Sequence, residues 1–120
     1  MYTFNFEKLE VWSKSRLLTK KTYLLTREFP ETEKFGLIPQ LRRAVISVCS
    51  NIAEGASRWS KKDKVHFYNV AFSSLMETMN QLILANDLEY IDNNELSEMR
   101  SEIHIISMML INLTKSMKSG

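Results

Sequence analysis

The side chains with the clearest chemical potential in this chain are basic ones near a single predicted turn, where one helix ends near residue 55 and the next begins near residue 60. Cations of this kind neutralise phosphates and release counterions, which gives salt-sensitive binding that is indifferent to sequence. Trp59 lies in the same turn and could stack on an unpaired base. The alternative is a solvated loop whose tryptophan packs at a joint between subunits. The basic residues assigned to this cluster are Arg42, Arg43, Arg58, Lys61, Lys62 and Lys64.

The net charge of +2 hides an uneven distribution along the chain. Residues 1–64 hold 13 lysines and arginines against 7 acidic residues, whereas residues 65–120 hold 3 against 7. Separate basic and acidic halves suit a polyanionic partner, or the complementary surfaces of two subunits. A second basic set marks the outer side of the first predicted helix, and such runs are usually solvated. Its members are Lys14, Arg16, Lys20, Lys21 and Arg27.

A polar stripe is expected beside the apolar face of the second predicted helix. Arg43, Ser47, Ser50 and Glu54 follow one another at helical spacing, and Asn51 can bond the neighbouring backbone near the helix end. Because the C-terminus of a helix carries partial negative charge, a glutamate there should have a specific partner. Arg43 and Glu54 are separated by about 16 Å of helix and cannot pair with each other. We therefore expect both to meet charges from other helices or subunits, in an architectural and not a catalytic role.

Signatures of catalysis and of metal binding are missing from the sequence. The glycine patterns of phosphate loops and dinucleotide-binding folds do not occur. His66 and His104 are the only histidines, and the Glu-x-x-His motif of di-iron bundles is absent. Cys49 has no histidine nearby in sequence, so a buried structural thiol is expected. We predict a protein that is not an enzyme and that has no metal, no cofactor and no small-molecule substrate.

Four helices are predicted to position these residues, the first over about residues 7–28 with Asn5 as its N-cap. The second should begin near Leu37, where Pro39 is tolerated because it falls in the first turn. Gly55 is expected to end this helix in the left-handed conformation, which glycine adopts without steric cost.

The third and fourth helices carry recognisable start signals. Ser60 is a candidate N-cap with Asp63 three residues later, and this helix should fade near Asp87. Asp92 and Glu95 repeat the same spacing at the start of the fourth helix.

The apolar periodicity predicts an all-α fold, an antiparallel up-down-up-down four-helix bundle formed by a single domain of residues 1–120. Connections of roughly five to eight residues favour antiparallel neighbours. In the fourth helix, steps of three and four residues define a bundle seam. The seam residues are Leu96, Met99, Ile103, Ile106, Leu110, Leu113 and Met117.

The fourth helix carries more apolar surface than one seam requires, since eight of residues 103–113 are apolar. Ile105 and Met109 are expected to widen the seam, while Met108 and Ile111 should point away from it. A helix this apolar is normally covered on more than one side, and a second subunit is the expected cover. The alternative is a packed N-terminal tail, or a few exposed methionines.

The composition is that of an ordinary globular protein, with 120 residues of which 44% are hydrophobic and 25% charged. A single cysteine cannot form an internal disulfide, which indicates a reducing, cytoplasmic location. No apolar run approaches the length of a membrane span, and the N-terminus lacks a signal pattern. We therefore expect no membrane partner.

The segment around the second helix resembles a known family. Its hallmark is Arg-Arg-Ala, then Ser, then Asn-Ile-Ala-Glu-Gly, then Arg, and the chain is similar to the small four-helix-bundle proteins encoded in intervening sequences of bacterial 23S rRNA genes, which are sometimes filed as ribosomal proteins. Residues 6–12 and 60–63 are similar as well, whereas Cys49 stands where proline is common. The hallmark is matched here by Arg42, Arg43, Ala44, Ser47, Asn51, Ile52, Ala53, Glu54, Gly55 and Arg58.

The resemblance implies a homo-oligomer, specifically a ring-shaped homopentamer, and a related accessory protein of diversity-generating retroelements binds nucleic acid through basic surfaces. The first hypothesis is thus a non-enzymatic, oligomeric protein that binds nucleic acid, specifically RNA. The second is a homo-oligomeric scaffold whose partners are proteins. An outward-facing basic cluster favours the first, and one consumed in ion pairs between subunits favours the second. Structural or interface roles are expected for Arg43, Ser47, Asn51, Glu54, Gly55, Ile105, Met108, Met109 and Ile111.

Overall fold

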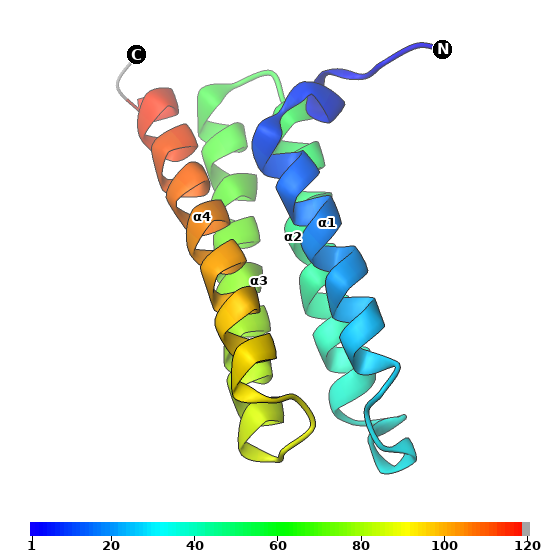
Figure 1. Cartoon of the computed structure of the whole chain (residues 1–120). Helices are drawn as coiled ribbons and strands as arrows, with labels where there is room; N and C mark the ends of the chain where they lie inside the picture. The colour runs from blue at the N-terminus through cyan, green and yellow to red at the C-terminus, as the bar shows by residue number, and fades with distance from the viewer. Residues whose placement is uncertain (119–120) are drawn as a thin grey trace.

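The chain folds into four α-helices preceded and interrupted by two short 3-10 helices, and the computed structural model describes residues 1–118. Each helix runs antiparallel to the one before it, so the predicted up-down-up-down bundle is confirmed (Figure 1). No strand occurs in the described residues. The elements are η1 (Asn5–Lys8), α1 (Glu10–Thr26), η2 (Glu31–Glu33), α2 (Leu37–Ser57), α3 (Lys61–Asp87) and α4 (Asn93–Lys118).

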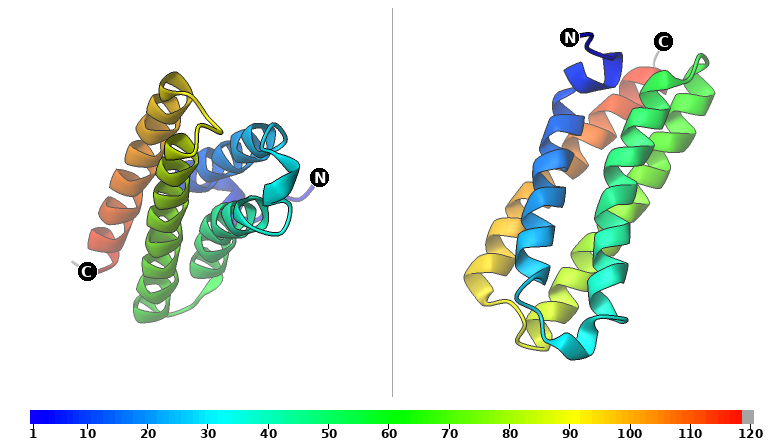
Figure 2. Two further views of the ribbon diagram at one scale, coloured as in Figure 1. Left: turned by 90° about the horizontal axis from the view of Figure 1, so that it is seen from below. Right: turned by 90° about the vertical axis from the view of Figure 1, so that its right-hand side faces the viewer.

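α2 packs most closely against α3, and the α3–α4 and α1–α2 contacts are next in extent. The α1–α4 contact is the weakest of the four between neighbouring helices. Figure 2 shows that α4 is not parallel to α1, since in its right-hand view α4 crosses behind α1 at an angle. One end of the bundle carries the N-terminal segment, the α2–α3 turn and the last turn of α4. We call it the terminal end (residues 1–10, 54–64 and 114–118). The opposite end is the η2 end (residues 27–36 and 87–98).

The seam predicted for α4 forms the core contact of that helix. Four of its residues are buried, and Leu96 and Leu113 pack against them. Met109 also packs on the core, as expected, but Ile105 does not widen the seam. Its side chain is 45% exposed, as much as the outward-facing Met108 at 44%, because α1 approaches α4 too loosely to cover it. The buried seam residues are Met99, Ile103, Ile106 and Leu110.

The start of α1 differs from the prediction. Asn5 is not the N-cap of a long first helix, because residues 5–8 form the separate 3-10 helix η1 and α1 begins only at Glu10. The Glu7 carboxylate accepts a hydrogen bond from the backbone N–H of Phe4 at 2.7 Å, which tightens this turn. The Phe6 ring packs edge-on against Trp12 with centroids 5.0 Å apart, which fixes the turn to α1.

The predicted starts of α3 and α4 are confirmed by their hydrogen bonds. Ser60 Oγ accepts from the backbone N–H of Asp63 at 3.1 Å. At α4, Asp92 Oδ1 accepts from the Glu95 N–H at 2.7 Å, and Glu95 Oε1 accepts from the Asp92 N–H at 3.0 Å. Each bond satisfies a backbone donor that the first turn of a helix leaves free.

Gly55 does not end α2 in the left-handed conformation. The helix continues to Ser57, and no residue of α2, Gly55 included, has a positive φ. Gly55 is buried instead, and a Cβ added to it would lie 2.6 Å from Cε1 of Tyr68 and 2.9 Å from its Cδ1. Glycine is therefore required here so that the α2 backbone can approach the ring of Tyr68 on α3.

Replacing Gly55 with Ala tests this contact, because the two possible effects have opposite signs. In an unobstructed helix interior the change would stabilise by about 0.5–1 kcal/mol. Here we expect a loss of about 1–3 kcal/mol in the free energy of unfolding, since Tyr68 is only 2% exposed and has little room to move. Chemical denaturation measures the difference. In a Tyr68→Ala background the same change should be neutral or stabilising, and a stabilised single variant would contradict the close contact.

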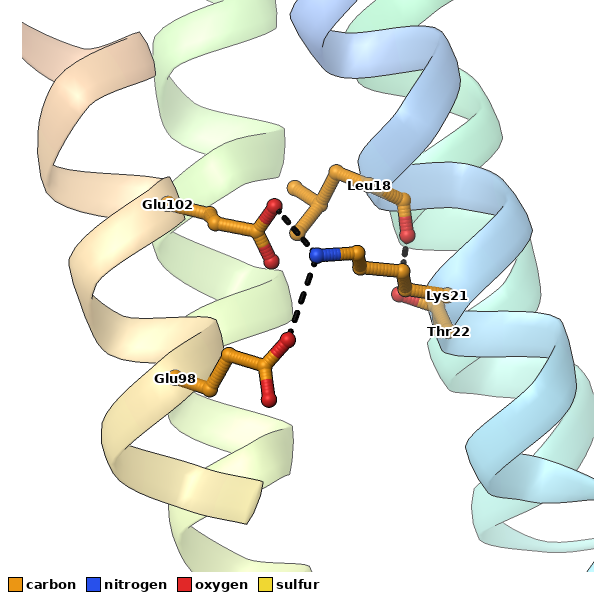
Figure 3. Close-up of polar contacts among 5 residues, drawn as sticks. All are labelled: Leu18, Lys21, Thr22, Glu98 and Glu102. Carbon is orange, nitrogen blue, oxygen red and sulfur yellow. Dashed lines mark hydrogen bonds and ion pairs between the residues drawn. The ribbon is translucent and has the colours of Figure 1, made fainter. Parts of the chain in front are cut away.

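The loose α1–α4 contact is bridged by one lysine. Lys21 Nζ lies 2.8 Å from Glu102 Oε1 and 3.2 Å from Glu98 Oε1, so a single cation holds two carboxylates of the facing helix (Figure 3). Hydrogen bonds to Glu102 and then to Glu98 raise the pKa of Lys21 above its usual value. The second oxygen of Glu102, Oε2, is buried and has no partner in residues 1–118.

The raised pKa of Lys21 predicts how this bridge depends on pH. A lysine whose pKa is higher in the folded state stabilises fully below its unfolded pKa, near 10.5, and loses that contribution as pH rises through the folded value. Its side chain is 41% exposed, so solvent limits the effect to about 1 kcal/mol or less. We expect Lys21→Met to melt at a lower temperature than the parent at pH 7, with the gap closing above pH 10.5. A gap that is constant with pH would rule out the ion pair as its cause.

Candidate functional site

The α2–α3 corner is built by only three residues that link two long helices. α2 ends at Ser57, Arg58 has extended backbone, and Ser60 caps α3. Trp59 lies between them with its side chain 99% exposed. A tryptophan this exposed forgoes the burial that usually places this residue in a core or interface. The corner therefore exposes a large aromatic surface to solvent.

Arg58 is held in place at this corner by two contacts. Its guanidinium carbon lies 4.5 Å from the centre of the Phe67 ring, and Nη2 is 3.3 Å from Glu54 Oε2. Glu54 thus has the specific partner that its position in the helix requires, but the partner comes from the end of its own helix and not from another one. Both side chains remain exposed, so this pair is of the kind that contributes about 0.3–0.5 kcal/mol.

Lys64 has a structural role that the sequence did not indicate. Its ammonium donates to the backbone carbonyl of Ala56 at 3.0 Å and to that of Gly55 at 3.4 Å. These are among the carbonyls left free at the end of α2, where a cation is favoured by the helix dipole. The charge of Lys64 is therefore already engaged in closing α2.

Lys61 and Lys62 are the basic residues of the corner whose charges are not used within the chain. Both are exposed in the first turn of α3, and neither has a hydrogen-bond or ion-pair partner among the described residues 1–118. Cations in the first turn of a helix oppose the dipole. The corner thus keeps two unpaired positive charges at a place where local stability does not favour them.

Arg42 and Arg43 do not belong to the corner, which corrects the predicted cluster. They lie in the second turn of α2, more than about 20 Å from Arg58 along the helix, because each residue adds about 1.5 Å. Arg42 Nε donates to Thr26 Oγ1 at 2.9 Å, and its guanidinium lies 4.4 Å from the centre of the Tyr23 ring, so it joins α2 to α1. Arg43 is exposed and has no partner within the described part of the chain.

The polar stripe of α2 connects this helix to α3. Ser47 Oγ and Ser74 Oγ are 2.8 Å apart, and the Asn51 amide donates to both the carbonyl and the hydroxyl of Ser47. Beside them a hollow of about 290 Å³ is lined by Arg43 and by Gln81. Gln81 is buried, and its amide oxygen has no partner in residues 1–118. No sequence pattern indicated this residue, because its burial follows from packing alone.

A larger hollow lies between the N-terminal segment and the corner. Its volume is about 620 Å³, and Phe4 and Phe6 line it together with Arg58, Trp59 and Lys64. The aromatic rings of residues 2, 4 and 6 pack in a row. The ring centroids are 5.0 Å apart between residues 2 and 4, and 6.4 Å apart between residues 4 and 6. Sequence reasoning did not assign Phe4 or Phe6 to a site, although the alternate aromatic residues ahead of the first helix were the available signal.

The second basic set, on the outer side of α1, also contains both side chains with a partner and side chains without one. Lys21 is paired with Glu98 and Glu102, and the guanidinium of Arg16 lies 5.4 Å from the centre of the Trp12 ring. Lys14 and Lys20 have no partner among the residues described.

The two ends of the bundle differ strongly in charge. The terminal end holds seven lysines and arginines and four acidic residues, whereas the η2 end holds two and eight. The asymmetry seen along the sequence is thus sharpened by the fold, because the turns of alternate helices collect at the same end. The candidate corner lies at the basic end.

Other possible chemistry has little support in the geometry. Cys49 is half-buried beside the Thr19 hydroxyl at 3.7 Å, and burial raises the pKa of its thiol, which disfavours the reactive thiolate. In residues 1–118 no group of three or more histidine, cysteine, aspartate or glutamate side chains is placed to hold a metal ion. Nor does any helix in that range combine the length and the apolar character needed to cross a membrane.

Comparison with known proteins places the chain in a family. Residues 7–112 match the model of the 23S rRNA-intervening sequence protein family. A crystal structure of a protein of unknown function from the S23 ribosomal protein family of Bacteroides thetaiotaomicron is 25% identical, with a TM-score of 0.79 over 88% of this chain and 98% of that one. No match is found among curated proteins. The match over most of its length shows that this chain belongs to the 23S rRNA-intervening sequence protein family.

Proposed function

We propose that this protein is a non-enzymatic, oligomeric nucleic-acid-binding protein of the cytoplasm, and that it binds RNA through the terminal end of the bundle. The observation that carries the proposal is the pair of unpartnered lysines, Lys61 and Lys62, beside the fully exposed Trp59. Two free cations next to an aromatic face match the two needs of a nucleic-acid strand, which are phosphate neutralisation and base stacking.

The interactions that the other basic side chains make within the chain support the terminal end as the binding surface. Lys64 and Arg42 are engaged by other parts of the chain, so their charges contribute mainly to structure. Arg58 is paired with Glu54 but stays exposed, and its guanidinium can still reach a phosphate. Lys115 and Lys118 add positive charge at the same end. A polyanion approaching the molecule is therefore attracted to the terminal end and repelled by the η2 end.

Self-association is proposed from apolar side chains that the fold leaves on the surface. Leu17 and Leu24 on α1 are exposed, as are Ile105 and Met108 on α4. These two helices are neighbours, and Lys21 bridges them between the apolar positions. A second copy of the chain is the natural cover for such a surface. The number of subunits, five, is proposed from resemblance to the family.

A protein scaffold is the second candidate, and Arg43 is the observation that favours it. This arginine lacks a partner in the described residues and lies beside the hollow that contains the unsatisfied amide of Gln81. A carboxylate from another subunit or protein would pair with Arg43, and a hydroxyl or amide donor beside it would satisfy the amide oxygen of Gln81. This possibility concerns the middle of the α2–α3 face and is compatible with nucleic-acid binding at the terminal end.

The paired substitution of Lys61 and Lys62 with Glu tests the nucleic-acid surface. We expect loss of RNA binding without loss of helix content, because both residues are exposed and unpartnered. Single replacements with Ala should lower the slope of log affinity against log salt by about 0.7 for each phosphate contact on a single strand. Lys64 is left unchanged because it closes α2.

Lys14 and Lys20 provide a matched control, since the same charge reversal on α1 changes the net charge equally. Binding measured by fluorescence anisotropy should survive in this control. The opposite pattern would move the site to α1, and no binding by the parent protein at low salt would remove the nucleic-acid proposal.

Light scattering at micromolar concentration tests self-association. We expect a mass several times that of a 14.0 kDa chain. Replacing Ile105 and Met108 with Lys should shift the protein towards the monomer, because two charges would be buried at the contact. A parent protein that scatters as a monomer would refute the proposal, whereas a closed oligomer of another size would correct only the number five.

A further inference from the structure

We propose that the hollow between residues 4–6 and the α2–α3 corner holds an unpaired base of a single-stranded nucleic acid, with Phe4 and Trp59 as its aromatic walls. This inference rests on the proposed nucleic-acid binding and specifies the form of nucleic acid recognised. It adds the N-terminal segment to the site, which the basic residues alone do not involve.

The dimensions and lining of the hollow suit a flat aromatic ligand. Its volume of about 620 Å³ falls within the range of roughly 300–1,000 Å³ that is usual for small-ligand sites. Phe4 and Trp59 both line it and are 59% and 99% exposed. Ala53 and Ala56 contribute small apolar side chains to the lining. A base entering this space would cover apolar surface that the chain itself leaves uncovered.

The aromatic wall on the N-terminal side is held in position by local contacts. The backbone N–H of Phe4 donates to the Glu7 carboxylate at 2.7 Å. The Phe4 ring stacks on Phe6, which in turn packs against Trp12 on α1. Phe4 is thus connected to the body of the bundle through η1. A wall fixed in advance loses less conformational entropy when a ligand binds than a free tail would.

The charges around the hollow identify the ligand as part of a polyanion. Arg58 and Lys64 line it, and Lys61 and Lys62 lie between them in sequence, in the first turn of α3. The acidic residues nearby are Glu54, which lines the hollow and is paired with Arg58, Glu7, which accepts from the Phe4 backbone N–H, and Asp63. A neutral aromatic peptide would use the rings but not the cations, whereas a nucleotide strand uses both. Bases in a duplex are stacked and paired, so only an unpaired base can enter the hollow and contact its aromatic lining.

Trp59 supplies a direct signal for base stacking. The chain has two tryptophans, and Trp12→Phe leaves Trp59 as the sole fluorophore. In this variant we expect a short single-stranded oligouridylate to quench the fluorescence with saturation at low salt. The same ribose-phosphate strand without bases should bind more weakly and quench little, and a blunt RNA duplex should quench little at matched occupancy. An oligothymidylate arm separates DNA from RNA, and stacking of either strand supports the base site.

Substitutions identify the walls. Trp59→Ala and Phe4→Ala should each weaken single-strand binding by about 5- to 140-fold, the range expected for loss of one stacked base. Trp59→Phe should restore most of the affinity. Phe35→Ala is the matched control, because Phe35 is also an exposed aromatic, at 90%, with Lys34 beside its ring 5.6 Å away, but it lies at the η2 end. Its affinity should equal that of the parent.

The possible failures are distinguishable. If strands with and without bases bind equally, and binding still depends on Lys61 and Lys62, the base site is wrong while the proposed function stands. If Trp59→Ala breaks the oligomer in light scattering, Trp59 is part of a subunit contact and the base site is likewise refuted. If no strand binds the parent protein, both proposals fail together. Circular dichroism confirms that each variant is folded, which is expected because both wall residues are exposed.

Discussion

The contact between Gly55 and the ring of Tyr68 sets how closely α2 and α3 can pack, and the rest of the terminal end is arranged around it. Because no side chain separates the two helices there, their connection needs only residues 58–60. A connection this short keeps Trp59 outside the core and brings Lys64 back within reach of the last carbonyls of α2. The exposed tryptophan and the engaged lysine are thus two results of one close helix approach.

Local sequence rules were sufficient for the starts of α3 and α4, but not for the start of α1 or for the mutual approach of the helices. The starts of α3 and α4 and the seam of α4 followed from side chains a few residues apart, whose interactions do not depend on distant parts of the chain. The role of Gly55 could not be found in this way. A glycine near a helix end usually adopts the left-handed conformation, and only the position of Tyr68 on another helix shows why this one does not.

The candidate site was predictable only in part, for the same reason. Lys61, Lys62 and Trp59 follow one another in sequence, so a sequence pattern could bring them to one place. Arg42 and Arg43 were wrongly added because closeness along the chain was taken as closeness in space, although a helix separates such residues by about 1.5 Å for each position. Phe4 was missed for the opposite reason, since it is far from Trp59 in sequence and only tertiary packing places both beside the same hollow.

The separation of charge between the two ends of the bundle has a consequence for any closed ring that this chain forms. Cyclic symmetry gives every subunit the same orientation relative to the ring axis, so corresponding ends recur around the ring at equal height. The basic ends would then act as repeated weak binding sites whose effective concentration for one long strand is high. Such a ring would discriminate by strand length, because a short strand spans one site and gains no avidity, whereas a longer one engages several.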